Sequence, residues 1–201
     1  LVASVYAVYA YSDDQKDAIT IAALLPLTGR GSHLIDMRYA LEEAVDVVNS
    51  WGGINGSKID LIIRDSQSNV SVAVQEFADL EASEKPLLYL SAMCGISLAL
   101  SSKAEEAGAV LMGGGVLLQN LTEGKEWVFR YSPTTGDDVA TVLSIVERLG
   151  SERVGVLYSN DMCTRAAMSM FVESFDIPNG TTVTQQFDER AETYYDEIAA
   201  L

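Results

Sequence analysis

Three residues in the sequence have side chains that commonly bind metals or act as nucleophiles and bases: His33, Cys94 and Cys163. They are the only histidine and the only two cysteines in 201 residues, and they are widely separated. A structural zinc site usually needs about four nitrogen or sulfur ligands at close spacing. A Ser-His-acid triad would have to use His33, and no G-x-S-x-G, Walker A or G-x-G-x-x-G motif accompanies a candidate residue. We therefore expect no metal site, no cofactor and no enzymatic activity.

The charge balance restricts the class of partner. The chain has 13 basic and 29 acidic residues, which give a formal net charge of -16. Such a field repels phosphate backbones, so we expect no nucleic-acid partner. We interpret the acidity as a solvated surface that keeps a secreted or salt-exposed protein soluble.

Other features suggest a location outside the cytosol. Residues 1–17 contain an apolar run ending in V-Y-A, which is typical of a signal peptide that has lost its basic end; the alternative is an N-terminal arm. No later stretch approaches the ~18 unbroken apolar residues of a membrane span. Four asparagines lie in N-x-S/T sequences and predict glycosylation, although turns and helix caps would also use asparagine there: Asn55, Asn69, Asn120 and Asn179.

Hydrophobic periodicity predicts alternating strands and helices. The apolar run 18–27 predicts a strand buried on both faces. From Leu34 the apolar residues recur every three or four positions, as on a helix that packs one stripe on a sheet. The stripe consists of Leu34, Met37, Leu41, Ala44, Val48 and Trp51.

A tight turn follows that helix. Gly52-Gly53 is expected to end the helix, and Asn55-Gly56 to reverse the chain into a strand over 57–65. Ile54, the lone apolar residue of the turn, is expected to pack into the end of the core.

The alternation continues along the rest of the chain. We expect helices over 70–83, 96–107, 137–149 and 161–174, strands over 86–90, 108–112, 152–158 and 181–187, an extended segment over 126–134, and the start of a helix within 191–201. This pattern predicts an α/β fold, a parallel sheet covered by helices on both faces. A domain change is expected near 132–135, and the second series has too few strands to stand alone.

The ordered segments "ITIAALLPLTG", "GGINGSKIDLIIRDSQSN", "EEAGAVLM", "VFRYSPT" and "RVGVLYSND" resemble the type I periplasmic-binding-protein superfamily. That superfamily includes branched-chain amino-acid binding proteins of ABC transporters and ligand-binding ectodomains of receptors. The resemblance implies a Venus flytrap, with a nearly complete lobe one over 18–133 and a truncated lobe two over 134–201. It also implies a missing C-terminal half that covers exposed apolar edges, and it allows a homo- or hetero-dimer through lobe one.

Ligands of open parallel sheets bind beyond the carboxyl ends of the strands. The candidate ligand-binding residues in those loops are His33, Leu34, Gly95, Ile96, Ser97, Gly115, Val116, Leu117, Tyr158, Asp161 and Cys163. The backbone of 95–97 could hold a carboxylate at a helix N-terminus. Each polar candidate has a plainer alternative: a helix cap for Ser97 and Asp161, and a solvated loop residue for His33. The glycines 113–115 serve either chain reversal or close approach of a ligand.

The resemblance also indicates what is missing. Where amino-acid binders carry hydroxyl residues, this chain has Gly95 and Val116-Leu117, and where they carry aromatics it has Leu34 and Cys163. We infer either a more apolar ligand or a lobe that no longer binds one. The family often has a disulfide between the loops after strands two and three. Cys94 matches one half, but serine occupies the other, so Cys94 is expected to be a free thiol; the alternative is a bond to Cys163 that ties the lobes across the cleft.

The leading hypothesis is a non-catalytic extracellular ligand-sensing module. It would belong to a receptor ectodomain tethered to the membrane by a segment absent from this chain. The alternative is a periplasmic solute-binding protein of an ABC importer for amino-acid-like or apolar carboxylate ligands. An α/β enzyme using Asp65 or Asp161 is a third hypothesis, which lacks a cofactor loop or paired catalytic groups.

Overall fold

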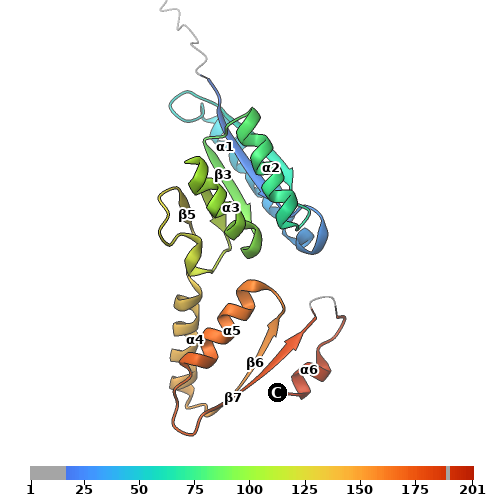
Figure 1. Cartoon of the computed structure of the whole chain (residues 1–201), viewed down its shortest axis with the longest axis vertical. Coiled ribbons are helices and arrows are strands. Elements are labelled where there is room, and N and C mark those ends of the chain that lie inside the picture. The colour runs from blue at the N-terminus through green and yellow to red at the C-terminus, as the bar shows by residue number, and fades with distance from the viewer. Residues whose placement is uncertain (1–16, 189–190) are drawn as a thin grey trace, which may run out of the picture.

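The structure is a computed structural model that describes residues 17–188 and 191–201. The chain forms two α/β units stacked along the long axis of the molecule, each containing its own parallel sheet (Figure 1). The expected signal peptide or N-terminal arm lies almost wholly outside the described residues.

The first unit contains a five-stranded sheet in the spatial order β2-β1-β3-β4-β5, and every neighbouring pair is parallel. Its strands are β1 (Ile19–Leu25), β2 (Ile59–Asp65), β3 (Leu88–Ala92), β4 (Val110–Gly114) and β5 (Val128–Arg130). Its helices are η1 (Gly29–Leu34), α1 (Asp36–Ser50), α2 (Val70–Ser83), α3 (Cys94–Ala107) and η2 (Gln119–Leu121). The predicted α/β class with a parallel sheet is confirmed.

The second unit is smaller. Its two parallel strands, β6 and β7, pair along their whole length. The elements are α4 (Thr135–Leu149), β6 (Arg153–Ser159), α5 (Met162–Ser174), β7 (Thr181–Phe187) and α6 (Tyr195–Ala199). The capping box of Thr134 and Asp137 starts α4 directly after the crossing between the units.

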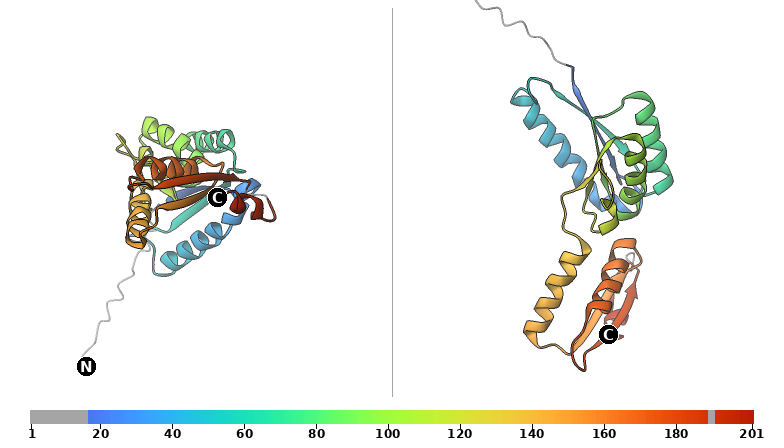
Figure 2. Two further views of the ribbon diagram at one scale, coloured as in Figure 1. Left: turned by 90° about the horizontal axis from the view of Figure 1, so that it is seen from below. Right: turned by 60° about the vertical axis from the view of Figure 1, so that its left-hand side comes forward.

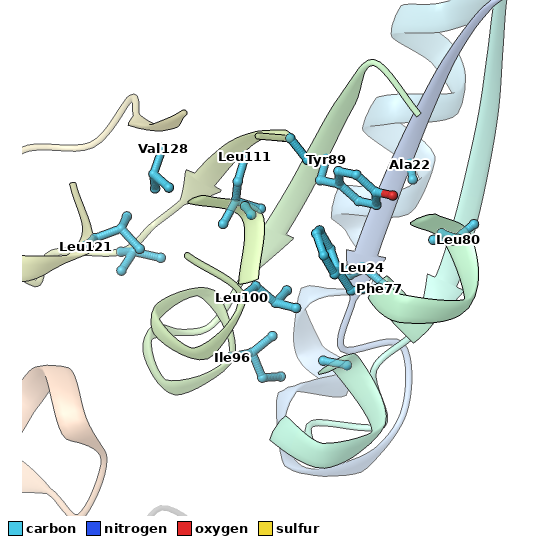
Figure 3. Close-up of a cluster of buried hydrophobic side chains, with 14 of the residues drawn as sticks. Ala22, Leu24, Phe77, Leu80, Tyr89, Ile96, Leu100, Leu111, Leu121 and Val128 are labelled. Carbon is cyan, nitrogen blue, oxygen red and sulfur yellow. The ribbon is translucent and has the colours of Figure 1, made fainter. Parts of the chain in front are cut away.

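Two apolar clusters lie on opposite faces of the first sheet. On one face, α2 and α3 cover a large core (Figure 3). In it the rings of Phe77 and Tyr89 pack at a tilt with their centroids 4.6 Å apart, and Leu100 and Leu111 are fully buried. On the other face, α1 places Met37 and Leu41 against a smaller cluster around Ala23, Leu25 and Ala92. The right-hand view of Figure 2 shows α1 and the α2–α3 pair on opposite sides of the strands.

The face that carries α1 is covered along only part of its width. Paired residues form a row across it, from Ile63 on β2 through Ala23 and Leu90 to Met112 and Phe129 on β4 and β5. Met37 and Leu41 pack at the β1–β2 end of this row. At the other end Phe129 is 48% exposed. This row is called the open face below.

The turn after α1 has the predicted backbone but not the predicted packing. Gly52 and Gly53 follow the helix with positive φ angles, and Asn55 and Gly56 reverse the chain with φ of 51° and 87°. The predictions for Ile54 and Trp51 are wrong, because their side chains are 45% and 83% exposed. The helix ends at Ser50, so Trp51 lies beyond the packed stripe. Ile54 belongs to a turn closed by its own hydrogen bonds to Ser57, away from the core.

Candidate functional site

A cavity of about 1150 Å³ lies between the two units, at the carboxyl ends of β3 and β4 and the start of α5. Its walls come from η1, the β3–α3 turn, the glycines that end β4, the crossing residues Tyr131 and Ser132, and the first turn of α5. This is the edge at which an open parallel sheet presents its loops. We call this cavity the cleft.

The β3–α3 turn brings a helix N-terminus to the cleft in a single residue. Strand β3 ends at Ala92 and α3 begins at Cys94, so Met93 alone makes the turn, with a φ of 70°. Met93 supplies no side-chain cap. The first-turn N–H groups of α3 therefore have no partner within the helix, and Cys94, Gly95 and Ile96 line the cleft. Such a terminus attracts an anion.

The N-terminus of α5, on the opposite wall, is capped. Asp161 Oδ1 accepts hydrogen bonds from the backbone N–H groups of Cys163 (2.8 Å) and Thr164 (3.1 Å). Oδ2 accepts from the hydroxyls of Ser159 and Thr164. Burial acts to raise the pKa of Asp161, but these hydrogen bonds outweigh it and lower the pKa below its usual value. The expectation of an N-cap is confirmed, and with both oxygens engaged the carboxylate is poorly placed to hold a ligand ammonium.

A second carboxylate positions the wall made by η1. Asp65, the last residue of β2, accepts hydrogen bonds from the backbone of Leu27 (3.0 Å), Thr28 (3.1 Å) and Gln67 (2.8 Å) and from the Thr28 hydroxyl (2.6 Å). Burial acts to raise the pKa of Asp65, and the hydrogen bonds reverse the shift and lower it. Asp65 thus fixes the loop after β1 to the end of β2. The contacts give this carboxylate a structural role.

Cys94 and Cys163 form a disulfide, with their Cα atoms 6.1 Å apart. The prediction that Cys94 is a free thiol is therefore wrong. The first residue of α3 and the second residue of α5 face each other across the boundary between the units, which brings together two cysteines separated by 69 positions in sequence. Cys163 is also a member of the large core of the first unit, although α5 belongs to the second.

Seven of the predicted ligand-binding residues line the cleft: His33, Leu34, Gly95, Ile96, Gly115, Asp161 and Cys163. The other four lie outside its lining. Ser97 is fully buried and accepts a hydrogen bond from Ser91 (2.8 Å), so it is neither a cleft residue nor a cap. Val116 is fully buried in the core, Leu117 packs against that core, and Tyr158 lies within β6. Val116 and Leu117 do follow β4, but their side chains pack into or against the core. Ser97 is the fourth residue of α3, which begins two residues earlier than predicted, and β6 extends through Tyr158 to Ser159.

Sequence reasoning missed other lining residues, of which the most informative are Arg30, Met37, Met93, Tyr131, Met162 and Arg165. Arg30 comes from the first unit and Arg165 from the second. With Asp161 satisfied by its own helix, two guanidinium groups give the cleft a positive character in a chain of net charge -16. No local pattern marks either arginine as a cleft residue, because the two come together only where the units pack.

Within residues 17–188 and 191–201, no group of three or more His, Cys, Asp or Glu side chains is arranged to hold a metal ion. None of the helices described there has the length and apolar character needed to span a bilayer.

Comparisons with known proteins agree with this geometry. A family profile described as periplasmic binding protein matches residues 18–196. The chemotactic signal transduction system substrate-binding protein BasB of Halobacterium salinarum is 29% identical over 138 residues, which is 64% of this chain and 33% of that protein.

Solved structures share the fold at low identity. The branched-chain amino acid transporter substrate-binding protein LivJ of Streptococcus pneumoniae, in complex with isoleucine, superposes with a TM-score of 0.75 at 20% identity over 92% of this chain and 53% of that one. A solute-binding protein of R. palustris in complex with benzoate gives a TM-score of 0.77 at 20% identity, over 90% and 51%. The chain therefore spans about a third to a half of the length of these relatives. From the family match and the shared fold, this chain belongs to the periplasmic binding protein family.

Proposed function

We propose that the cleft binds a small organic carboxylate with an apolar body. The observation that carries the proposal is the uncapped N-terminus of α3, which opens into a cleft flanked by Arg30 and Arg165. Free N–H groups and a helix dipole favour an anion, and guanidinium groups pair well with carboxylates. The side chains of Leu34, Met37, Ile96 and Met162 supply the apolar part of the wall.

Relatives provide the first ligands to test. Related proteins have been solved in complex with isoleucine, leucine and benzoate. Each carries a carboxylate, and each has an apolar body. A hydroxyl residue of the usual amino-acid grip is absent at Gly95, which lines the cleft, and this favours benzoate-like acids over α-amino acids.

Thermal unfolding with each acid tests the proposal. A ligand that binds only the folded chain stabilises it by about 2.7 kcal/mol at 100 times its Kd. We expect a rise in melting temperature with benzoate and no rise with its uncharged amide, benzamide, because the amide keeps the ring and lacks the anion. No shift across a broad set of small carboxylates would contradict the proposal.

Blocking the cleft locates the site. In the variant Gly95→Trp the first side-chain atom meets only Val70 Cγ2 at 3.9 Å, so the indole can enter the cleft without displacing the backbone. We expect this variant to fold and to lose the ligand-induced shift. Ser102→Trp, on an exposed position of the same helix, is the matched control and should keep the shift. Retained binding in Gly95→Trp would place the site elsewhere.

For the role of the whole protein we propose substrate delivery to a membrane partner, either an importer or a chemotaxis receptor. The names of the relatives, which include transport proteins and a chemotactic substrate-binding protein, support this. A receptor ectodomain remains the second candidate, favoured by the exposure of Asn55, Asn69, Asn120 and Asn179, each in a potential glycosylation sequence. Sequencing beyond codon 201 discriminates between them: a membrane-spanning segment after the remaining half-lobes would indicate a receptor.

We further propose that residues 18–133 and 134–201 are lobes one and two of a flytrap. Further polypeptide of the same protein would cover the open face and the exposed side chains of Val142, Ile145 and Leu149 on α4. Apolar patches of this kind mark surfaces that are covered in the working protein. The location outside the cytosol is supported by the disulfide, because such bonds persist in oxidising compartments.

A further inference from the structure

We propose that the disulfide between Cys94 and Cys163 is a redox-sensitive tether that limits how far the cleft opens. The proposal rests on the proposed function, because the tether regulates the same cleft. It concerns a covalent link between the two units, whereas the disulfide that the family often has lies within the first unit.

Within the described residues the backbone passes between the two units over 131–134, between β5 and α4. The disulfide adds a second link between the starts of α3 and α5. Two bodies joined at two separate points can rotate about the line through those points but cannot move apart at either one. While the bond is intact the starts of α3 and α5 cannot move apart, so the bond limits how far the cleft opens on that side.

The non-covalent contact at the disulfide is small. Cys163 of α5 belongs to the core cluster of the first unit, and Ala166 packs against that cluster. Among the described residues these two are the cluster's only contribution from the second unit, so little apolar contact holds the starts of α3 and α5 together once the bond is broken. Reduction therefore frees a movement that the backbone crossing alone does not prevent.

The position of both sulfurs favours exchange with external thiols. Each cysteine lies in the first turn of a helix, where the positive end of the dipole stabilises a thiolate. A stabilised thiolate makes a disulfide easier to reduce. Cys94 is half-buried and lines the cleft, whereas Cys163 is 7% exposed, so Cys94 Sγ is the accessible target.

The exchange is balanced with a dithiol as reductant. A dithiol thiolate attacks Cys94 Sγ, and the Cys163 thiolate leaves and takes up a proton. The second thiol of the reductant then attacks its own sulfur in the mixed disulfide and releases the Cys94 thiol. Two electrons and two protons pass to the protein, and the dithiol becomes a cyclic disulfide.

Linkage gives the proposal a quantitative consequence. A ligand that prefers the tethered cleft must protect the disulfide from reduction by the same factor by which the disulfide strengthens binding. Coupling of this kind is commonly about 5- to 150-fold, and a tenfold effect shifts the potential of a two-electron couple by about 30 mV.

The test begins without ligand. Peptide mapping under non-reducing conditions should recover a fragment that joins Cys94 to Cys163. Small-angle X-ray scattering should give a larger radius of gyration when dithiothreitol is added to the wild-type chain. Cys94→Ser should have the larger radius with or without dithiothreitol. Cys163→Ala removes the same bond and should behave in the same way, so that failure of one variant to fold does not decide the result. Recovery of two free thiols after air oxidation, or equal radii in all samples, would overturn the tether.

Benzoate, leucine and isoleucine then serve as probes. For any probe that binds, we expect a Kd about tenfold lower for the oxidised chain than for the reduced chain or for Cys94→Ser. Equal Kd values would overturn the regulatory role even where the bond is present. Failure of every carboxylate to bind would contradict the proposed function alone, because the scattering comparison needs no ligand.

Discussion

Asp161 joins several parts of the second unit through one carboxylate. It accepts four hydrogen bonds, two from the first turn of α5 and two from the hydroxyls of Ser159 and Thr164. Removing an N-cap of this kind costs about 1 kcal/mol. We expect Asp161→Ala to unfold at a lower temperature than the wild-type chain. Asp161→Asn, which keeps an acceptor for the helix N–H groups, should lose less.

The lowered pKa of Asp161 also fixes how stability responds to acid. A carboxyl whose folded pKa is depressed stabilises the folded state above its unfolded pKa of about 4, and this contribution is lost as pH falls through the folded pKa. At pH values below about 4 the wild-type melting temperature should therefore decrease. The difference in melting temperature between the wild-type chain and Asp161→Ala should become smaller in the same range. Thermal unfolding followed by circular dichroism from pH 7 to pH 3 measures both. A difference in melting temperature between the two proteins that stays constant with pH, or no difference at pH 7, would contradict this account.

Single residues also mark the limit of prediction from the sequence. Asp161 follows an apolar strand and precedes a helical pattern, so local rules alone identify it as a cap. The bond between Cys94 and Cys163, which are 69 residues apart, depends on how the two units pack, and no local pattern encodes that. Arg30 and Arg165 were missed for the same reason, since their shared position in the cleft arises only when the units come together.

At the scale of elements, α3 contributes to both the core and the cleft. Its residue Leu100 is fully buried in the core. The first turn of α3 forms the wall that faces the proposed ligand. Leu100→Ala deletes buried apolar atoms and leaves a cavity, at a cost of about 2–5 kcal/mol. We expect a clear fall in the free energy of unfolding, measured by urea denaturation with the disulfide intact. Leu87→Ala, at a side chain that is 65% exposed, is the matched control and should change it by less than ~0.5 kcal/mol.

Two further outcomes would be informative. An unchanged urea midpoint in Leu100→Ala would mean that α3 contributes little to the core. A loss equal to that of Leu100→Ala in the Leu87→Ala control would mean that Leu87 is covered in solution.

The order and type of the elements could be predicted because each one carries a strong local pattern. Helix α2 and strand β7 have the predicted bounds, 70–83 and 181–187. Strands β3 and β4 both begin two residues later than predicted, because the apolar runs start at Pro86 and Gly108, before the ladder does. Because β3 ends at Ala92 and α3 begins at Cys94, the turn between them consists of Met93 alone, and Ser97 and Val116 are fully buried outside the cleft. An error of two residues in the strand bounds therefore became an error in the predicted site.

At the scale of the whole molecule, the excess of acidic residues should dominate the response to salt. The chain has 29 acidic and 13 basic residues. In the described parts of the chain three ion pairs form, all on side chains at least one third exposed: Arg38–Glu42, Arg64–Glu76 and Lys103–Glu106. Exposed pairs contribute little, so most of the acidic charge repels itself. Self-repulsion of this kind destabilises the compact state.

Potassium chloride should relieve that repulsion. The Debye length falls from about 10 Å at 0.1 M to about 3 Å at 1 M, so neighbouring carboxylates are screened at the higher concentration. We expect the melting temperature to rise over this range. A gain of 1 kcal/mol corresponds to about 2–4 °C for a chain of this size.

A variant with fewer charges separates screening from general salt effects. Glu43 and Asp46 are exposed on α1, and Asp60 is exposed on the neighbouring strand β2. Replacing them by Gln, Asn and Asn removes three negative charges without touching the core. This variant should melt higher than the wild-type chain at 0.1 M and gain less on going to 1 M. If both chains gain equally, the salt acts through burial of apolar surface and the acidic field does not limit stability.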